Sequence, residues 1–450
     1  MNIIIVGVGK IGFNLARNLS QEGHSITAID IDKNVVNQVV DEIDCLGIVG
    51  NAVVKSVLVD ANIENADILI ACTASDEINM LTCLLANKFK KLKTIARIRD
   101  PEYTTEINYL KEQLKLSYTI NPELAASNEI NRVMRYSSAI SSESFIRNKV
   151  NLLKVQVVEG SPLCGVKLYD IQYKFDCKLV LCIIERNDDI IIPSGNDEIQ
   201  VNDKISFVAD HDNAIDFFKH AGFDYSPIKS VMIIGGGKIS YYLIKILQNN
   251  CSIKIIDSDK KVCEDLLETF PEISVVHADG SDKRILLQEG IENVDAFLSL
   301  TGIDEENIIL SLFAKKMGDN KIFTKINRTN FSEVMKELDM GTIINPEIIC
   351  SNIITKQVRS YESTKGSNIE KFYKLCDDKV EALEFFISEE SNVTNIKLKD
   401  LKFKKDTLIA CISRNNKIII PNGNDELIKN DSVVVITKND MLNDITKIIE

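Results

Sequence analysis

The sequence predicts an α/β protein with two parallel-sheet domains, each followed by a small α+β domain. Three observations support this fold class. Short apolar runs alternate with helical patterns at the start of each half, a glycine-rich motif follows the first apolar run of each half, and the second half repeats the first. Strands that alternate with helices indicate βαβ units and therefore a parallel sheet.

An internal repeat sets the domain organisation. Its period of 228 residues is about half of the 450-residue chain, which indicates a duplication rather than a solenoid. The matching segments are Gly7–Gly12 with Gly235–Ser240, Asp30 and Asp32 with Asp257 and Asp259, Asp76–Asn79 with Asp304–Asn307, Asn121–Glu123 with Asn345–Glu347, and Pro193–Glu198 with Pro421–Glu426.

The pattern of each half predicts the following elements. The first parallel sheet should contain Asn2–Val6, Ser25–Ile29, Cys45–Val49, Ile68–Cys72, Thr94–Ile98 and Tyr118–Ile120. A long helix should begin at Pro122 with Asn121 as its N-cap. Two strands, Lys178–Ile184 and Asp189–Ile192, should form a hairpin through residues 185–188. We predict domains at 1–136, 145–223, 229–360 and 370–450, with polar linkers at 137–143 and 360–367.

Composition excludes several classes of function. The net charge of −13 repels nucleic acid and bare anionic membrane. Apolar runs such as Leu179–Ile184 are too short to span a membrane, and Met1–Val6 does not resemble a signal peptide, so we expect a soluble, cytoplasmic protein. The 11 cysteines form no CxxC pair, so we expect reduced thiols and no metal site.

The first glycine-rich motif predicts a dinucleotide-binding, Rossmann-type turn. It follows an apolar strand and opens a helix, and an acid ends the next strand about 20 residues later. Gly7 permits the tight turn, Gly9 lets the backbone approach a phosphate, and Gly12 lets the helix pack against the strand. The Asp30 carboxylate should bind the ribose hydroxyls and repel a 2′-phosphate, which favours NAD or adenosine over NADP. The alternative is a glycine-rich turn that binds nothing.

The second copy differs in ways that affect binding. Ser240 replaces the third glycine, so helix and strand should lie slightly further apart, while Asp257 is retained. Arg97 and Arg99 should face the ligand from a strand's carboxyl end, but they become Lys325 and Asn327 in the repeat. The alternative for the arginines is pairing with surface acids. Asp76, Glu77 and Asn79 open a helix, where capping is at least as plausible as ligand contact.

The chain lacks signs of catalysis. A dehydrogenase needs a proton-transfer group beside the hydride, and none of the four histidines recurs between the copies. No GxSxG, HExxH or P-loop motif is present either. The sequence favours a nucleotide sensor. The alternatives are an NAD-dependent oxidoreductase with a duplicated Rossmann domain and a scaffold whose sites bind nothing.

With both halves considered, the chain resembles the RCK/KTN family over essentially its whole length. The small domains resemble the RCK-C module through Pro193–Glu198 with Asp203, and Pro421–Glu426 with Asp431. The other matching segments are Gly7–Gly12, Asp30, Gly50–Ala52 with Leu58, Arg97–Tyr103, Asn121–Glu123 and the second copies of these.

The resemblance implies a cytoplasmic regulatory protein that binds NAD(H), or ATP or ADP. It implies a homo-oligomeric ring, formed by four chains, on the inner face of a separate Trk-type potassium channel or transporter in the cell membrane. Nucleotide binding should change the angle between paired domains and so gate the membrane subunit. The expected ligand contacts in the first copy are Gly7, Val8, Gly9, Lys10, Ile11, Gly12, Asp30, Asn51, Ala52, Cys72, Thr73, Arg97 and Arg99. Those in the second are Gly235, Gly236, Gly237, Lys238, Ile239, Ser240, Asp257, Asp279, Gly280, Leu300 and Thr301.

Overall fold

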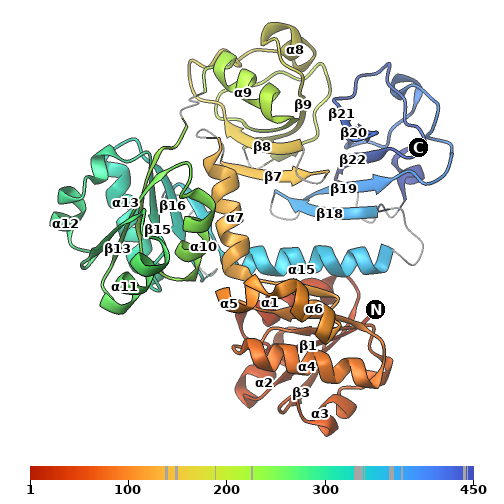
Figure 1. Cartoon of the computed structure of the whole chain (residues 1–450). Helices are drawn as coiled ribbons and strands as arrows, with labels where there is room; N and C mark the ends of the chain where they lie inside the picture. The colour runs from red at the N-terminus through yellow and green to blue at the C-terminus, as the bar shows by residue number, and fades with distance from the viewer. Residues whose placement is uncertain are drawn as a thin grey trace. The chain divides into compact units, whose positions relative to one another are not determined.

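The structure is a computed structural model that describes residues 1–136, 140–146, 150–187, 189–223, 227–328, 338, 340–363, 369–376, 379–438, 442 and 444–450. Its internal contacts divide the chain into two units. The first unit contains Met1–Asn131 and Lys229–Val358, and the second contains Arg132–Ile228 and Arg359–Glu450. Each unit therefore combines corresponding parts of the two repeats (Figure 1).

The first unit begins with a six-stranded parallel sheet. Its strands are β1 (Asn2–Val6), β2 (Ser25–Asp30), β3 (Leu46–Val49), β4 (Ile68–Ala71), β5 (Lys93–Arg97) and β6 (Tyr118–Ile120). They lie in the order β3-β2-β1-β4-β5-β6, so the direction of winding reverses between β1 and β4. The helices are α1 (Lys10–Gln21), α2 (Lys33–Glu42), α3 (Lys55–Asp60), η1 (Ile63–Asn65), α4 (Asp76–Phe89), α5 (Pro101–Thr105), α6 (Ile107–Leu114) and α7 (Pro122–Met134).

The second sheet of this unit repeats the first. Its strands are β12 (Ser230–Ile234), β13 (Ser252–Asp257), β14 (Ser274–His277), β15 (Ala296–Ser299), β16 (Lys321–Lys325) and β17 (Thr342–Ile344), in the order β14-β13-β12-β15-β16-β17. Its described helices are α10 (Lys238–Leu247), α11 (Lys260–Thr269), α12 (Lys283–Gln288), η3 (Ile291–Asn293), α13 (Asp304–Met317) and α15 (Pro346–Ser363). Both parallel sheets were predicted, and this part of the fold class is confirmed.

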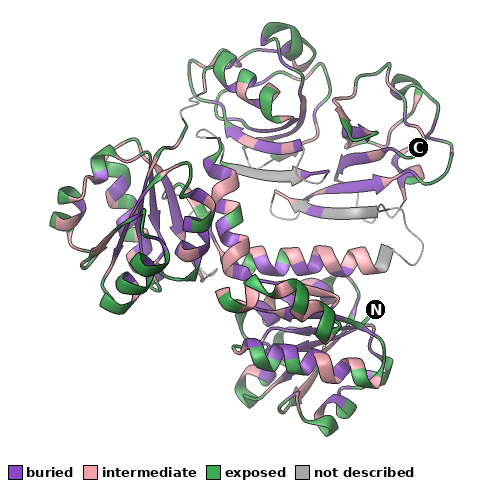
Figure 2. Cartoon of the chain, in the orientation of Figure 1, coloured by how far each residue is buried: buried purple, intermediate pink, exposed green. Residues whose placement is uncertain are grey.

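Helices bury both faces of each parallel sheet. The central strands β1 and β4 show this most clearly, because four consecutive residues of each are buried (Figure 2). Continuous burial is typical of parallel strands that helices cover on both sides. On one face, Leu58 of α3 and Met80 of α4 pack with Ile4 and Val6 of β1. The strands' carboxyl ends are thereby fixed relative to one another.

The second unit contains two antiparallel sheets, which confirms the predicted α+β domains. The first consists of β7 (Ser141–Phe145), β8 (Val150–Gln156), β9 (Val180–Arg186), β10 (Asp189–Ile191) and β11 (Lys204–Ala209), in the order β10-β9-β11-β8-β7. The second consists of β18 (Ile369–Leu375), β19 (Val380–Phe386), β20 (Thr407–Arg414), β21 (Lys417–Ile419) and β22 (Ser432–Thr437), in the order β18-β19-β22-β20-β21. The helices are η2 (Leu168–Asp170), α8 (Ile171–Lys174), α9 (His211–His220), η4 (Leu398–Asp400) and η5 (Ile445–Ile448).

A buried ion pair recurs in both antiparallel domains. The Asp203 carboxylate is fully buried and accepts two hydrogen bonds, of 2.8 and 2.7 Å, from the Arg186 guanidinium. Arg414 and Asp431 repeat this arrangement at 3.0 and 2.9 Å. Such bidentate bonds are charge-assisted and directional. Each arginine also donates to a carbonyl of the segment before its aspartate, Glu198 for Arg186 and Glu426 for Arg414, so the pair ties this segment to the sheet.

The two antiparallel domains also share an apolar core. Phe145 and Tyr373 meet edge to face with ring centroids 4.7 Å apart, and Cys182 and Cys411 are buried in the same cluster. All 11 cysteines are free, as predicted. Burial raises the pKa of the Cys182 and Cys411 thiols, so both remain protonated at neutral pH.

Three sequence predictions of connections are wrong. Residues 141–143 of the predicted linker belong to β7, which pairs with β8 at the sheet edge, where polar residues are tolerated. Residues 360–363 continue α15. Strand β9 includes Glu185 and Arg186, which were predicted to lie in the hairpin connection. Residues 137–139, 188 and 364–367 of these segments lie outside the described residues. The predicted bounds of the four domains remain predictions.

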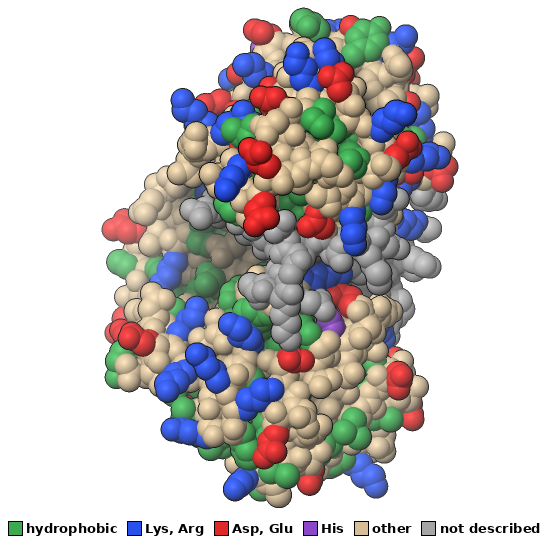
Figure 3. Space-filling model, turned by 90° about the vertical axis from the view of Figure 1, so that its right-hand side faces the viewer, with side chains coloured by type: hydrophobic (Ala, Val, Ile, Leu, Met, Phe, Trp, Pro, Cys, Tyr) green, Lys and Arg blue, Asp and Glu red, His purple; other side chains and the backbone are tan. Residues whose placement is uncertain are grey.

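Acidic and basic side chains are both spread over the face drawn in Figure 3. No helix among the described residues combines the length and hydropathy that a membrane span requires. The described residues also contain no group of three or more His, Cys, Asp or Glu side chains that could hold a metal ion.

Candidate nucleotide-binding sites

Three glycines shape the turn between β1 and α1, each for a different reason. Gly7 adopts a φ of +83°, and a Cβ there would lie 2.6 Å from the Thr73 nitrogen. A Cβ on Gly12 would lie 2.1 Å from the Gly7 carbonyl oxygen, so only glycine fits this packing. A Cβ on Gly9 would meet no atom within 4 Å, so this position has open space in front of it.

The N-terminus of α1 is available to an anion. Gly9 is the N-cap residue, and without a side chain it forms no capping hydrogen bond. The first N–H groups of a helix lack intrahelical partners and carry the positive end of the helix dipole. An N-terminus with these properties is suited to a phosphate group. Gly237 repeats this arrangement at α10, again with open space at the Cβ position.

Asp30 has a structural role that the sequence did not reveal. It ends β2, and its carboxylate accepts hydrogen bonds from the Val8 nitrogen at 2.9 Å and the Asp32 nitrogen at 3.1 Å. Asp257 does the same in the second copy, with the Gly236 nitrogen at 2.6 Å and the Asp259 nitrogen at 2.8 Å. The acid thus ties the glycine turn to the neighbouring strand, and whether it also binds ribose stays a prediction.

Ser240 replaces the third glycine without breaking the turn. Its hydroxyl donates a 2.5 Å hydrogen bond to the Gly235 carbonyl. In the first copy, the matching carbonyl of Gly7 lies close to Gly12. Gly235 keeps a positive φ of +100°. The second turn therefore has the same backbone conformation at its first glycine, with a hydrogen bond where the first copy has close packing.

The segment after β3 lies beside Asp30. The Gly50 nitrogen donates to the Asp30 carbonyl at 2.8 Å, which places the exposed Asn51 next to the end of β2. Ala52 is buried in the core, so its side chain does not face a ligand. In the second copy, Asp279 accepts hydrogen bonds from the Ser281 nitrogen and hydroxyl, and these hold the pKa of its carboxyl below the usual value.

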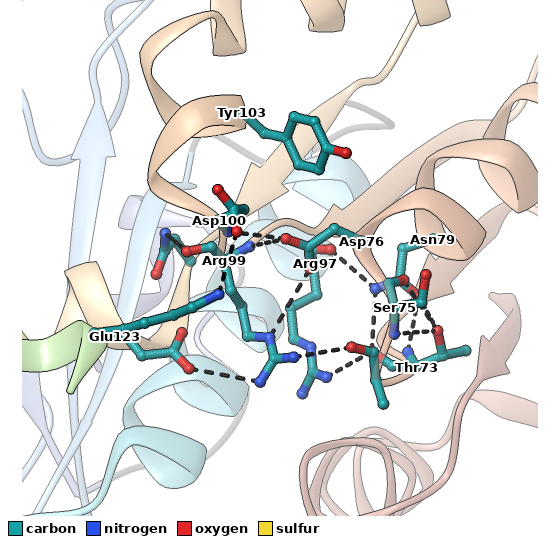
Figure 4. Close-up of polar contacts among 12 residues, drawn as sticks. Thr73, Ser75, Asp76, Asn79, Arg97, Arg99, Asp100, Tyr103 and Glu123 are labelled. Carbon is teal, nitrogen blue, oxygen red and sulfur yellow. Dashed lines mark hydrogen bonds and ion pairs between the residues drawn. The ribbon is translucent and has the colours of Figure 1, made fainter. Parts of the chain in front are cut away.

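The loop after β4 is held by an asparagine. Cys72 is buried, its thiol contacts the Gly7 carbonyl at 3.2 Å, and burial raises its pKa to about 12. The Thr73 nitrogen and hydroxyl both donate to Asn79 Oδ1 at 2.8 Å. Asn79 is fully buried and donates in turn to the carbonyls of Thr73 and Arg97. Asn79 therefore joins the ends of β4 and β5 (Figure 4).

Asn307 repeats this arrangement in the second copy. The Thr301 nitrogen and hydroxyl donate to Asn307 Oδ1 at 2.9 Å, and Asn307 donates to the carbonyls of Thr301 and Lys325. Leu300, just before this threonine, is buried. Asp76 and Glu77 lie in the first turn of α4, as the capping reading expected, and Ser75 is the N-cap residue. The role of Asn79 in joining two strand ends was not predicted.

Arg97 ends β5 and Arg99 follows it, and both side chains point toward the loop after β4 (Figure 4). Arg97 donates to the Thr73 carbonyl at 2.5 Å, and Arg99 donates to the Ala74 carbonyl at 2.8 Å. The Arg99 guanidinium also lies 3.9 Å from Asp76 and 3.7 Å from Glu123. The Nε atoms of both arginines are buried and form no hydrogen bond with the described residues.

The second copy has a different set of charged residues at this place. Lys325 donates to the Thr301 carbonyl at 3.1 Å, and burial lowers its pKa. Asn327 takes the place of Arg99 and donates to Asp304. Arg328, one residue further, pairs with Glu305 at 2.8 Å on the surface. Sequence reasoning did not single out this arginine.

The structure thus brings the predicted residues together at one edge of each sheet. The glycine turn follows β1, Asp30 ends β2, Asn51 follows β3, Thr73 follows β4 and Arg97 ends β5. Because β1 lies between β2 and β4, these residues surround the point where the winding direction reverses, which is where ligands bind in open α/β sheets. The turn lysines point across to the other copy, with Lys10 3.6 Å from Glu347 and Lys238 3.5 Å from Asp100.

Comparison with known proteins matches the chain to two domain families, each of them twice. Residues 3–122 and 231–346 match the TrkA-N domain family, and residues 152–222 and 382–450 match the TrkA-C domain family. The chain is 30% identical over 444 residues to Trk system potassium uptake protein TrkA homolog 1 of Methanosarcina mazei, covering 97% of both chains. It is also 30% identical to Trk system potassium uptake protein TrkA of Haemophilus influenzae, covering 97% of this chain and 95% of that protein.

Solved structures share the fold. The GsuK channel bound to NAD matches with a TM-score of 0.64 and 15% identity, over 97% of this chain and 76% of that one. GsuK bound to ADP matches with a TM-score of 0.51 and 14% identity, over 80% of this chain and 69% of that one.

Proposed function

Because the chain belongs to the family of Trk-system potassium uptake proteins TrkA, we propose that it is a regulatory subunit that binds an adenine nucleotide at each parallel sheet and gates a membrane potassium transporter. The observation that carries this proposal is the pair of glycine-capped helix N-termini, Gly9 at α1 and Gly237 at α10. Each faces open space beside an acid that ends the neighbouring strand.

The residues at each sheet edge fit NAD(H), ATP or ADP. A diphosphate placed against the N-terminus of α1 or α10 would receive backbone N–H groups. Asp30 or Asp257 would bind the ribose, and Asn51 or Asp279 would lie next to it. The remaining backbone contacts would come from the loops that contain Thr73 and Thr301. Arg97 and Arg99 would hold the phosphates of the first site, and Lys325 takes the place of Arg97 in the second.

The positions of the four histidines support a nucleotide sensor more than an enzyme. His211 and His220 belong to the antiparallel domains and bond to Tyr136 and the Phe175 carbonyl. His24 precedes β2, at the opposite end of the strand from Asp30. His277 ends β14 in the second copy, where the first copy has Val49. No histidine thus serves both sites, so we propose binding without catalysis.

The names of the relatives describe potassium uptake, which supports a membrane transporter as the partner. A Trk-type channel or transporter would hold this chain at the inner face of the membrane. Four chains with two Rossmann-type domains each would supply a ring of eight. Nucleotide binding can shift the conformation of such a ring only by binding its two states with different affinity.

Two measurements test the proposal. Calorimetry with NADH, NAD, ATP and ADP should show two sites per chain, and Asp30→Ala should weaken the first site far more than the second, because it removes both the proposed sugar contact and the anchor of the glycine turn. Potassium flux through the membrane partner, reconstituted with and without this protein, should respond to nucleotide only when the protein is present. The same nucleotide response in both preparations would refute the regulatory role.

A further inference from the structure

A tyrosine hydroxyl joins the two copies of the parallel-sheet domain. Tyr242 belongs to α10 of the second copy and is buried. Its hydroxyl donates to the Arg99 carbonyl of the first copy at 2.9 Å and accepts from Asn121 Nδ2 at 2.9 Å. The Thr104 hydroxyl lies 3.0 Å away. Burial raises the pKa of Tyr242 above its usual value, so the hydroxyl keeps its proton at neutral pH.

On the second-copy side, the tyrosine belongs to the helix that should bind phosphate. Gly237 is the N-cap of α10, and Tyr242 follows it by little more than one turn. The first turn of α10 is also bonded to the first copy, because the Ser127 hydroxyl of α7 donates to the Ile239 carbonyl at 2.8 Å. A displacement of α10 toward a phosphate would therefore move atoms that are bonded to the first copy.

In the first copy, the same contacts involve Arg99, which is a predicted ligand residue. The Arg99 carbonyl accepts from Tyr242 and Asn121, while the Arg99 side chain lies beside Ala74, Asp76 and Glu123. Asn121 also begins the helix that leaves the domain, since its Oδ1 accepts from the Leu124 nitrogen at 2.9 Å. The backbone that positions Arg99 thus depends on α10 of the other copy.

In the part of the chain that the structure describes, the repeat does not produce a second copy of this junction. The repeat counterparts of Tyr242 and Asn121 are Asn14 and Asn345. Both are among the described residues, and they form no hydrogen bond with each other there. Among the described residues, the two copies therefore share one such tyrosine link, which runs from α10 to Arg99.

We propose that the Tyr242 hydroxyl is a positioning residue that couples the two nucleotide sites, so that a nucleotide bound at one site raises the affinity of the other. The inference rests on the proposed function. Both ligands need the shared junction in one fixed arrangement, Arg99 for the first site and α10 for the second. The ligand that binds first bears the ordering cost of the junction, and the second ligand bears less of it. Positive coupling follows.

The test uses ADP calorimetry on the full-length chain. Gly9→Asp and Gly237→Asp each leave one site and give its intrinsic affinity. The unsubstituted chain, titrated at both sites, gives the affinity of each site with the other filled. We expect a ratio of about fivefold or more, within the usual range of allosteric coupling. Tyr242→Phe should bring the ratio to within about twofold of one. Tyr241→Phe is the matched control, since Tyr241 lies on the same helix and its hydroxyl has no bond to described residues.

The possible outcomes separate the coupling from the proposed function. A ratio near one in the unsubstituted chain, a ratio below one, a ratio that Tyr242→Phe leaves intact, or an equal loss in Tyr241→Phe overturns the coupling. In all these cases ADP still binds, so the proposed function stands. If ADP binds neither Gly9→Asp nor Gly237→Asp, the proposed function fails and the coupling fails with it. A merely structural role would lower the melting temperature of Tyr242→Phe without moving the ratio, and that result also overturns the proposal.

Discussion

Replacing Gly9 by Asp should abolish phosphate binding at the first site without harming the fold. Gly9 has φ −64° and ψ −163°, which any residue can adopt, and a Cβ there would meet no atom within 4 Å. Aspartate is also a good N-cap residue, worth a few tenths of a kcal/mol more than glycine. We therefore expect the melting temperature of Gly9→Asp to equal or exceed that of the unsubstituted chain.

The expected loss of affinity is electrostatic. Two unit negative charges about 4 Å apart repel by about 4 kcal/mol at an effective dielectric constant of about 20. Each 1.4 kcal/mol corresponds to a factor of about ten in affinity, so the loss should be about a thousandfold at low salt. Gly9→Asn adds a side chain of nearly the same shape without the charge. The ratio between the Asp and Asn variants therefore isolates the repulsion from the steric effect of either side chain.

The assay is calorimetry with ADP in the Gly237→Asp background, where only the first site contributes. Adenosine, which has no phosphate, serves as the control ligand and should not distinguish Gly9→Asp from Gly9→Asn. Added salt should shrink the ADP ratio because it screens exposed charges. If ADP binds the two variants within about fivefold of each other, or if adenosine separates them as strongly, the phosphate does not lie at the N-terminus of α1 and the site has been assigned wrongly.

Three further predictions concern stability. Asn79→Ala should lower the free energy of unfolding of the first unit by about 2–4 kcal/mol in urea titrations, because it leaves partly buried backbone groups of Thr73 and Arg97 without their partner. An effect below about 1 kcal/mol would contradict this reading. Gly12→Ser should lower the free energy of unfolding by about 1–3 kcal/mol because its Cβ would overlap the Gly7 carbonyl, although serine is the native residue at the matching position 240. If thermal melting shows the variant to be as stable as the parent, the packing argument is refuted. Burial lowers the pKa of Lys321 from 10.5 to about 7, so the unfolded chain binds one more proton than the folded chain between these pH values. The free energy of unfolding should therefore rise through that range by at most about 1.4 kcal/mol per pH unit from this group. Lys321→Met should remove that rise and stabilise the chain at pH 7, and identical pH profiles of the two proteins would count against it.

The sequence was sufficient for the parallel sheets because their strands are short, continuous apolar runs next to strong turn signals. Strand β1 has the predicted bounds, and β6 does as well. The glycine turn was also predicted, since Gly7 needs its positive φ and Gly12 lies against the Gly7 carbonyl only five residues away. These features depend on residues close together in the chain, and local patterns describe them well.

The missed features depend on contacts between distant residues. Strand β7 was mistaken for a linker because an edge strand bonds on one side only and tolerates serines. Asn79 looked like one more polar residue at a helix start, yet it is buried because Thr73 and Arg97 are brought to it by β4 and β5. Arg186 was placed in a turn because nothing local reveals its pairing with Asp203, 17 residues away in the chain.

The two copies have the same fold, and their residues differ at positions where the contacts between the copies differ. Asn79 and Asn307 hold the same loop in both copies through the same hydrogen bonds. Arg99 and Asn327 occupy matching places but have different neighbours, because only Arg99 has its carbonyl bonded to Tyr242 of the other copy. A homodimer of identical domains would have to carry such a link twice or not at all. Duplication within one chain removes that constraint, and a single link from α10 to Arg99 can then make the two sites unequal while both keep the same backbone.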